Sequence, residues 1–287
     1  MNFAQELANQ FSLQLWQAEK VIELIDEGNT IPFIARYRKE AHGSLDDQTL
    51  RGMAERLEYL RGLEKRREEV RGLIDAVGAL TPEVAASLDA ASTLAELDDV
   101  YRPFRPKRRT RASMAKEKGL EPLALLLLEQ KPQVDPLAEA AAYIDAEKGV
   151  ESAEDALAGA RDIIAENVSD DPSLRKRLRV VAMAQSDLVS KAAKPDEDSV
   201  YAQYYDFRQP VRQAAGHRVL AVDRGEREGF LKVSIELDRT RALSIVESAC
   251  VRGTSPSSQE VRAAAEDAYD RLIFPSLERE IRAALTE

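Results

Sequence analysis

The sequence predicts a mainly α-helical protein of about two domains. Its composition is dominated by Ala, Leu, Glu and Arg, with 32% charged and 6% aromatic residues, which is typical of exposed helices carrying opposite-charge pairs. Apolar residues recur at helical spacing through most of the chain, and only one stretch alternates strictly between apolar and polar residues. We expect a multi-helix bundle with one short β element near residues 230–238. An N-terminal helical domain would cover residues 1–190, and a C-terminal helical part residues 195–287.

The first forty residues predict two short helices separated by a tight break. The first helix carries apolar residues at helical spacing, namely Leu15, Ala18, Ile22 and Ile25. Gly28 interrupts this pattern, and Thr30 can cap a second helix whose first turn holds Pro32. The end of this second helix is basic, where the helix dipole favours positive charge, through Arg36, Arg38 and Lys39.

A long amphipathic helix is predicted next. Ser44 begins a capping-box pattern, Ser-Leu-Asp-Asp, ahead of an apolar stripe of roughly eight turns. The stripe consists of Met53, Leu57, Leu60, Leu63, Val70, Ile74 and Val77. The outer face mixes both signs of charge, so we interpret it as solvated surface. Caps predict further helix starts at Thr81, Thr93, Ser152 and Asp171.

One segment predicts a half-buried strand. Its apolar residues, Leu231, Val233, Ile235 and Leu237, alternate with polar ones. The nearby stretch 204–211 is the candidate partner, and Pro210 restricts it to a sheet edge. The polar stretch 191–198 around a proline predicts a surface loop. The last helical pattern runs to the final residues without a glycine stop, so we expect the sequence to be cut from a longer chain.

A cluster of basic residues stands out because the chain has a net charge of -10. Residues 101–116 contain no acid and seven basic residues, namely Arg102, Arg105, Lys107, Arg108, Arg109, Arg111 and Lys116. Arg102 and Arg105 each precede a proline, which favours extended backbone. The sequence therefore predicts an extended loop leading into a helix from about Thr110. Arginine binds phosphate bidentately, and Tyr101 and Phe104 would stack on bases if they were exposed.

Internal pairing is the alternative interpretation of this cluster. The basic side chains would then pair with the protein's own carboxylates, and Tyr101 and Phe104 would be core residues. Charge alone leaves both interpretations open. A second basic run, Arg175 to Arg179, lies on a predicted helix, where we interpret it as a solvated face.

The sequence gives little support for catalysis. Cys250 is the single cysteine, which excludes an internal disulfide framework or zinc cluster and fits a reducing cytoplasm. With two histidines in the chain, Cys250 and His217 would meet only by chance. No phosphate-loop, dinucleotide or metalloprotease motif occurs, and the acidic pairs at Asp98 and Asp170 fit helix-start or loop roles. We therefore predict no enzyme activity, no metal, no cofactor, no small-molecule substrate and, without a long apolar run, no membrane insertion.

Two stretches resemble a known family. "DEGNTIPFIARYRKE" (residues 26–40) and "YRPFRPKRRTRASMAKEKGLEPLA" (residues 101–124) are similar to the N-terminal region of the Tex family, bacterial transcription accessory proteins similar to a eukaryotic elongation factor. The resemblance continues through "YYDFRQPV" and "HRVLAVDRGEREGFLKVSIEL". It implies a longer protein with RNase H-like, helix-hairpin-helix and OB-fold RNA-binding domains. It also implies an N-terminal helical scaffold with a helix-turn-helix-like element, and nucleic-acid binding during transcription without catalysis.

We therefore predict the N-terminal scaffold of a non-catalytic transcription accessory protein in the cytoplasm, which contacts RNA or DNA weakly and without sequence preference. The predicted contact residues are Arg105, Lys107, Arg108, Arg109, Arg111, Lys116, Arg36, Arg38 and Lys39. The alternative is a protein-interaction module that docks on RNA polymerase or on other domains of the same chain. A nuclease is a third hypothesis, based only on the nuclease-like fold implied by the resemblance, and this segment lacks the Asp-Asp-Glu metal motif it would need.

Overall fold

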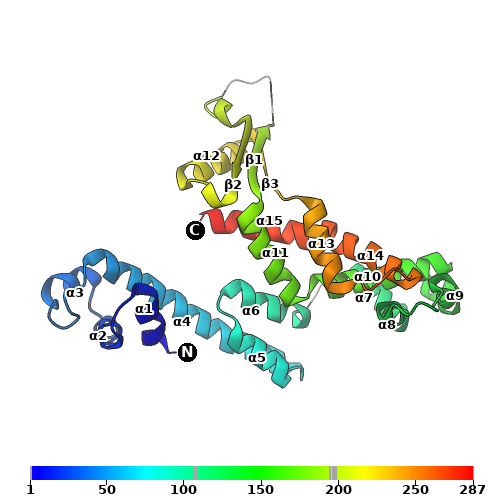
Figure 1. Ribbon diagram of the computed structural model, residues 1–287, viewed down its shortest axis with the longest axis horizontal. Helices are drawn as coiled ribbons and strands as arrows, with labels where there is room; N and C mark the ends of the chain where they lie inside the picture. Colours follow the sequence, from blue (N-terminus) through cyan, green and yellow to red (C-terminus); the bar gives the residue numbers. More distant parts are fainter. Residues whose placement is uncertain (1, 107–108, 194, 196–198, 287) are drawn as a thin grey trace. The chain divides into compact units, whose positions relative to one another are not determined.

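The computed structural model is mainly α-helical, as predicted, and describes residues 2–106, 109–193, 195 and 199–286 (Figure 1). It divides into two compact units, Met1–Phe104 and Arg105–Glu287, which we call unit 1 and unit 2. The predicted boundary between a domain of residues 1–190 and a part of residues 195–287 stays a prediction.

In the described residues of unit 1, all regular secondary structure is helical. Its elements are α1 (Phe3–Phe11), α2 (Leu15–Asp26), α3 (Ile31–Tyr37), α4 (Asp47–Ala76), α5 (Pro82–Ala90), α6 (Leu94–Tyr101) and a 3₁₀ turn (Arg102–Phe104). The long helix α4 begins later than the sequence predicts. Asp46 is its N-cap and accepts a hydrogen bond from Thr49 N at 2.7 Å, whereas Ser44 lies in the preceding turn with φ of 59°. The aspartate therefore replaces the serine as the helix start.

The apolar stripe of α4 serves two separate cores. Its first half packs with α1, α2 and α3 through Leu50, Met53, Leu57 and Leu60. Its second half packs with α5 and α6 through Leu63, Val70 and Ile74. The predicted stripe is confirmed up to Ile74, but Val77 follows the helix and is 63% exposed.

A charged side chain completes this stripe. Arg67 is 4% exposed, and it donates from Nε to the carbonyl oxygen of Leu88 at 3.0 Å and from a terminal nitrogen to that of Ala91 at 2.8 Å. It also pairs with Glu64. The last carbonyls of a helix lack hydrogen-bond donors within the helix. Arg67 supplies donors to these carbonyls at the end of α5 and so ties that helix to α4.

Unit 2 combines helices with one small sheet. Its helices are α7 (Arg111–Glu117), α8 (Glu121–Glu129), α9 (Pro136–Ala140), α10 (Ala153–Ser169), α11 (Pro172–Gln185), α12 (Gly216–Arg227), α13 (Arg239–Cys250), α14 (Pro256–Asp267) and α15 (Phe274–Thr286). A π-helical segment (Ala268–Ile273) joins the last two. The helix α10 is central and packs against α7, α8, α9 and α14. It comes so close to Leu120 that a Cβ at Gly159 would lie 2.3 Å from that side chain.

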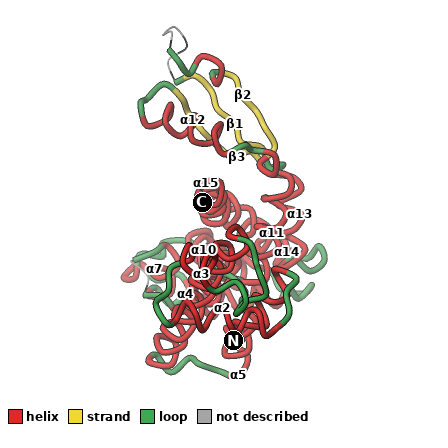
Figure 2. Tube along the Cα trace, turned by 90° about the vertical axis from the view of Figure 1, so that its left-hand side faces the viewer, coloured by secondary structure: helices red, strands yellow, loops and turns green. Residues whose placement is uncertain are grey.

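The sheet has three antiparallel strands in the order β2-β1-β3 (Figure 2). The predicted strand is confirmed as β3 (Leu231–Glu236), and the stretch expected to pair with it forms β2 (Asp206–Pro210) at the opposite edge. Both pair with β1 (Asp187–Ala192), a central strand that the sequence did not predict. The first two residues of the predicted loop 191–198 therefore belong to a strand. Helix α12 lies beside the sheet and packs on β3.

The second basic run is a solvated face only in part. Lys176 and Arg177 are exposed, as predicted, whereas Arg175 is buried and Arg179 half-buried. Arg175 of α11 is 2% exposed, and its guanidinium lies 2.6 Å from a carboxylate oxygen of Glu280 on α15. Arg179 pairs with the same carboxylate at 2.8 Å. These side chains join two helices about a hundred residues apart, a pairing that the local charge pattern does not reveal.

Candidate nucleic-acid interface

The predicted contact residues fall into two sets, one in each unit. In unit 2, Arg105, Arg109, Arg111 and Lys116, the loop set, are all exposed. Lys107 and Arg108 lie outside the described residues. Helix α7 starts where the sequence predicts, because Thr110 and Ser113 form a reciprocal capping box.

The segment before this loop differs from the prediction. Arg102 has φ of -52° and ψ of -44° and lies in a 3₁₀ turn, so the chain is not extended before Pro103. Tyr101 is 8% exposed in the core formed with α5 and α6, and Phe104 packs against the same core. The condition for base stacking is therefore not met, and the alternative expectation, that both rings belong to the core, is confirmed. They anchor the turn, and the guanidinium of Arg66 lies 5.9 Å from the Tyr101 ring centre.

Carboxylates of unit 2 partly neutralise the loop set. Arg109 lies 3.4 Å from Glu117, and both side chains are mostly exposed. Lys116 lies 2.9 Å from Glu121, again at an exposed position. Exposed ion pairs contribute only about 0–1 kcal/mol. Internal pairing therefore exists in this set, but a phosphate can compete with it at low energetic cost.

The second set lies in unit 1, at the end of α3, and consists of Arg36, Arg38 and Lys39, the α3 set. Helix α2 ends at Asp26, and Gly28 follows with φ of 84°, a left-handed conformation that favours glycine. Thr30 then stands at the N-cap of α3 without a side-chain capping bond. All three basic side chains are exposed. Among the described residues, none of them lies within 4.0 Å of a carboxylate.

A buried histidine anchors the turn that carries the α3 set. His42 is fully buried, and Leu45 N donates to its Nδ1 at 3.1 Å. The proton of the neutral ring is therefore assigned to Nε2, which donates to the carbonyl oxygen of Ile34 at 3.3 Å. Next to it, Gly43 has φ of 71°, and a Cβ there would lie 2.7 Å from the Gln17 amide nitrogen. This turn is therefore tied to both α2 and α3.

Two exposed aromatic side chains accompany the α3 set and were not predicted. Phe33 and Tyr37 are 38% and 65% exposed, with ring centres 5.2 Å apart. The guanidinium of Arg38 lies 5.8 Å from the Phe33 ring centre, and that of Arg36 lies 6.0 Å from the Tyr37 ring centre. The available signal was their i,i+4 spacing on a short helix whose only buried residue is Ile34.

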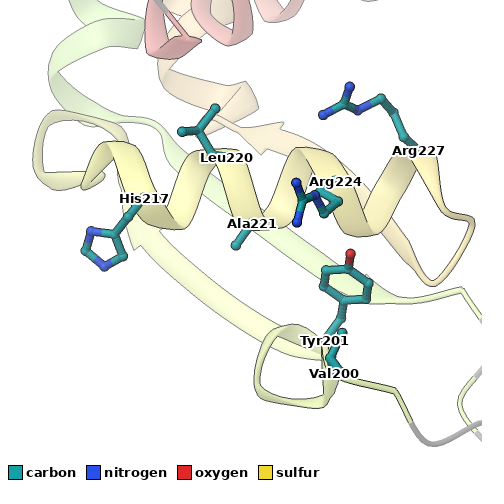
Figure 3. Close-up of a pocket in the computed structure, with 7 residues that line it drawn as sticks. All are labelled: Val200, Tyr201, His217, Leu220, Ala221, Arg224 and Arg227. Atoms are coloured by element: carbon teal, nitrogen blue, oxygen red, sulfur yellow. The ribbon is translucent and has the colours of Figure 1, made fainter.

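A second exposed surface, also not predicted, lies on α12 (Figure 3). An open cavity of about 450 Å³, the α12 groove, is lined by Val200, Tyr201, His217, Leu220, Ala221, Arg224 and Arg227. Val200 and Leu220 are 85% and 61% exposed, whereas Tyr201 is buried. The acids of the same helix, Asp223 and Glu226, pair instead with Arg282 at 2.7 and 2.6 Å. The charged side chains that line the groove are therefore basic.

No group of three His, Cys, Asp or Glu side chains in the described part of the chain is placed to hold a metal ion. Likewise, none of the helices in residues 2–106, 109–193, 195 and 199–286 combines the length and hydropathy of a membrane span.

Comparison with known proteins relates the sequence to one family. Residues 1–75 match the Tex-like protein N-terminal domain, and residues 131–287 match the Tex central region-like family. An uncharacterized protein of Bacillus subtilis, YdcI, is 42% identical over 99% of this chain and 40% of its own length. The transcriptional accessory protein Tex of Neisseria gonorrhoeae is 42% identical over 82% of this chain and 31% of its own length.

A more distant human relative, S1 RNA-binding domain-containing protein 1, is 27% identical over 99% of this chain and 30% of its own length. The chain thus spans 30–40% of the length of these three relatives. The central-region match alone covers more than half of the chain. The chain therefore belongs to the Tex family.

Proposed function

We propose that this chain is a nucleic-acid-contacting scaffold of a non-catalytic transcription accessory protein that acts in the cytoplasm. The names of two relatives support this proposal, since one is a transcriptional accessory protein and another carries an S1 RNA-binding domain. The observation that carries it is the α3 set, three exposed basic side chains without a carboxylate within ion-pair distance among the described residues.

The proposed contact is with phosphate, and it is weak and independent of sequence. Phosphate contacts position a protein on nucleic acid but carry no base information. The net charge of -10 opposes binding elsewhere on the surface. The loop set would add further contacts by exchanging its exposed carboxylate partners for phosphate.

Salt titration of a labelled oligonucleotide tests this proposal. With about three to five phosphate contacts, the logarithm of the affinity should fall with the logarithm of the salt concentration at a slope of roughly -2 to -5. Changing the α3 set to Ala should weaken binding and flatten the slope by about 2 to 3 units. Changing three members of the loop set, Arg109, Arg111 and Lys116, to Ala measures their share separately.

The matched control removes three lysines that make exposed ion pairs elsewhere, Lys20, Lys131 and Lys148. This variant loses the same net charge but leaves both basic sets intact. It should therefore shift the affinity only slightly and leave the salt slope unchanged. Equal slopes for the control and for both test variants would refute the phosphate contact.

The absence of catalysis is part of the proposal and has its own test. The chain should not hydrolyse nucleic acid, nucleotides or esters with or without Mg²⁺ or Mn²⁺. A turnover that survives repurification and disappears when one acidic residue is changed would overturn it.

The α12 groove favours a second candidate function, docking on RNA polymerase. Val200 and Leu220 are large exposed aliphatic side chains, and Arg224 and Arg227 lie beside them in the groove (Figure 3). Exposed apolar side chains flanked by arginine are typical of protein interfaces. Leu220→Asp should abolish retention of purified RNA polymerase on the immobilised chain. Val180→Asp, which replaces a 63% exposed residue of α11, should not affect it.

A further inference from the structure

We propose that the exposed face of α3 binds unpaired nucleotides, with Phe33 and Tyr37 stacking on bases while the α3 set holds the adjoining phosphates. This inference rests on the proposed function and specifies its ligand. It assigns the two rings a binding role and distinguishes single-stranded from double-stranded nucleic acid.

The first argument is the exposure of the rings. Tyr37 is 65% and Phe33 38% exposed, although large aromatic side chains dominate the cores of proteins. Neither belongs to the apolar side chains that pack with α4, since α3 contacts that core through Ile34, Ile31 and Ala35. The two rings therefore contribute little to the packing of unit 1, and their exposed surface is available to a ligand.

The second argument is the arrangement of rings and cations. Arg38 lies 5.8 Å from the centre of the Phe33 ring and Arg36 lies 6.0 Å from that of Tyr37, while the rings are 5.2 Å apart. The two rings thus lie next to each other, and each has a guanidinium group beside it. Single-stranded nucleic acid carries a phosphate beside each flat base, and proteins bind it by combining aromatic stacking with a basic path along its backbone.

The third argument separates single strands from duplexes. A helix that reads duplex DNA places polar side chains against base edges in the major groove. On α3 the exposed residues include Pro32 and Phe33, which have no side-chain hydrogen-bonding group, and Tyr37 offers one hydroxyl. Bases inside a duplex are already stacked on each other and present no free face. A duplex would therefore meet only the basic side chains, whereas an unpaired strand would meet the rings as well.

Aromatic residues and arginine also mark protein interfaces, so a protein partner is the rival occupant. Such a partner would have to bring carboxylates to three cations that have none within 4.0 Å among the described residues. A nucleic-acid strand carries one phosphate for each base, so it brings this negative charge together with the bases. The combination of free rings and uncompensated cations favours the nucleic acid.

The test compares one labelled 20-nucleotide single strand of mixed sequence with the duplex of the same sequence. Replacing Phe33 and Tyr37 together by Leu keeps apolar surface but removes the flat ring faces. This variant should weaken single-strand binding by about 5- to 150-fold for each ring removed, from the known size of base–aromatic stacking, and change duplex binding by less than about twofold. The salt slope should stay at its wild-type value for both probes.

Two further variants complete the experiment. Tyr37→Trp alone, with Phe33 intact, enlarges the ring and should maintain or strengthen single-strand binding. Leu73→Ala, at a 45% exposed apolar position of α4, controls for loss of exposed apolar surface and should change neither affinity. A circular dichroism melt of each variant should match the wild type, because the changed side chains lie outside the core.

The outcomes separate this inference from the proposed function. Equal losses on both probes, or no loss on either, overturn stacking while leaving phosphate binding by the basic sets in place. If the wild type binds neither probe at low salt, the proposed function itself fails. Binding of an acidic protein that depends on both rings, without single-strand binding, would assign the surface to the rival occupant.

Discussion

The side-chain amide of Gln130 donates to the carbonyl oxygen of Cys250 at 2.8 Å, joining the ends of α8 and α13 across 120 residues of sequence. Its amide oxygen also accepts from Arg252 N at 2.6 Å. Gln130 is 6% exposed and has φ of 53°, a left-handed conformation that costs a side chain roughly 1 kcal/mol. The two hydrogen bonds offset this cost.

Gln130→Ala should lower the free energy of unfolding by about 1–3 kcal/mol, because it removes both bonds and keeps the unfavourable backbone conformation. Gln130→Gly should cost about 1 kcal/mol less than Ala, because glycine adopts a positive φ without a steric penalty. Urea unfolding followed by circular dichroism measures both variants. Gln133→Ala, at an exposed position nearby, should have no effect. Equal stability of the Ala and Gly variants would contradict the argument about backbone strain.

The thiol of Cys250 should react slowly with alkylating reagents. Burial raises its pKa to about 11, and its Sγ donates to the carbonyl oxygen of Val246 at 3.3 Å. At pH 8 the thiolate fraction is then on the order of a hundred times smaller than for a free cysteine of pKa about 8.5. Iodoacetamide labelling followed by mass spectrometry should show this difference. Labelling in urea should restore the normal rate, and fast labelling of the folded chain would contradict the prediction.

Stability should fall at acidic pH through Glu280. Its burial alone would raise the pKa of this carboxyl, but Arg175 and Arg179 outweigh that effect, so the pKa lies below its usual value of 4.5. The folded state then binds fewer protons than the unfolded state near that value. The stabilisation is therefore complete above pH of about 4.5 and is lost as the pH falls through the lower folded-state pKa.

Glu280→Gln should destabilise the fold at pH 7 by about 2–4 kcal/mol, because Arg175 remains buried without its counter-charge. The difference from the wild type should shrink as the pH falls below about 4. Glu129→Gln, which alters an exposed pair with Lys131, serves as the control and should stay within about 0.5 kcal/mol. If the Glu280→Gln variant loses the same stability at pH 3 as at pH 7, the charge of Glu280 is not the cause.

Two glycines in helices should respond in opposite directions to Ala. A Cβ at Gly225 of α12 would lie 2.6 Å from the Leu231 side chain and 3.0 Å from the Tyr201 ring. Gly225→Ala should therefore separate α12 from β3 and cost about 1–3 kcal/mol. No atom lies within 4 Å of a Cβ at Gly62 in α4, so Gly62→Ala should stabilise by about 0.5–1 kcal/mol through helix propensity. Thermal melts of both variants decide the question, and a loss at both positions would be inconsistent with this packing.

The strands show how far the sequence determines the fold. The half-buried strand β3 was predicted because its two faces differ. In β1, Leu188, Val189 and Ser190 are all buried, since this strand has neighbours on both edges and is covered on both faces. The alternation that would identify a strand is therefore absent. Ser190 makes the strand still harder to recognise, because a polar residue stands at a buried position. Its hydroxyl donates a hydrogen bond to the carbonyl oxygen of Tyr204 at 2.7 Å.

The candidate site shows the same limit for side chains. Local charge identified the basic residues of the loop and α3 sets, but their partners are set by the fold. Arg175 looked like its solvated neighbours until Glu280, 105 residues later, was placed beside it. The exposure of Tyr37 likewise depends on which face of α3 packs against α4. Ile34, the single buried residue of α3, marks that face. Short helices give too few residues to define that face from periodicity alone.

The division of α4 between two cores has a consequence for hydrogen exchange. The helix has 30 residues and is about 45 Å long, and its two halves are held by different neighbours. Opening of the first core exposes the amides up to about Leu60 but leaves those beyond Leu63 protected by α5 and α6. Tyr59 packs against both cores and marks the junction. Amide protection along α4 should therefore show two plateaus with a step near Tyr59, and a ligand on α3 should raise only the first.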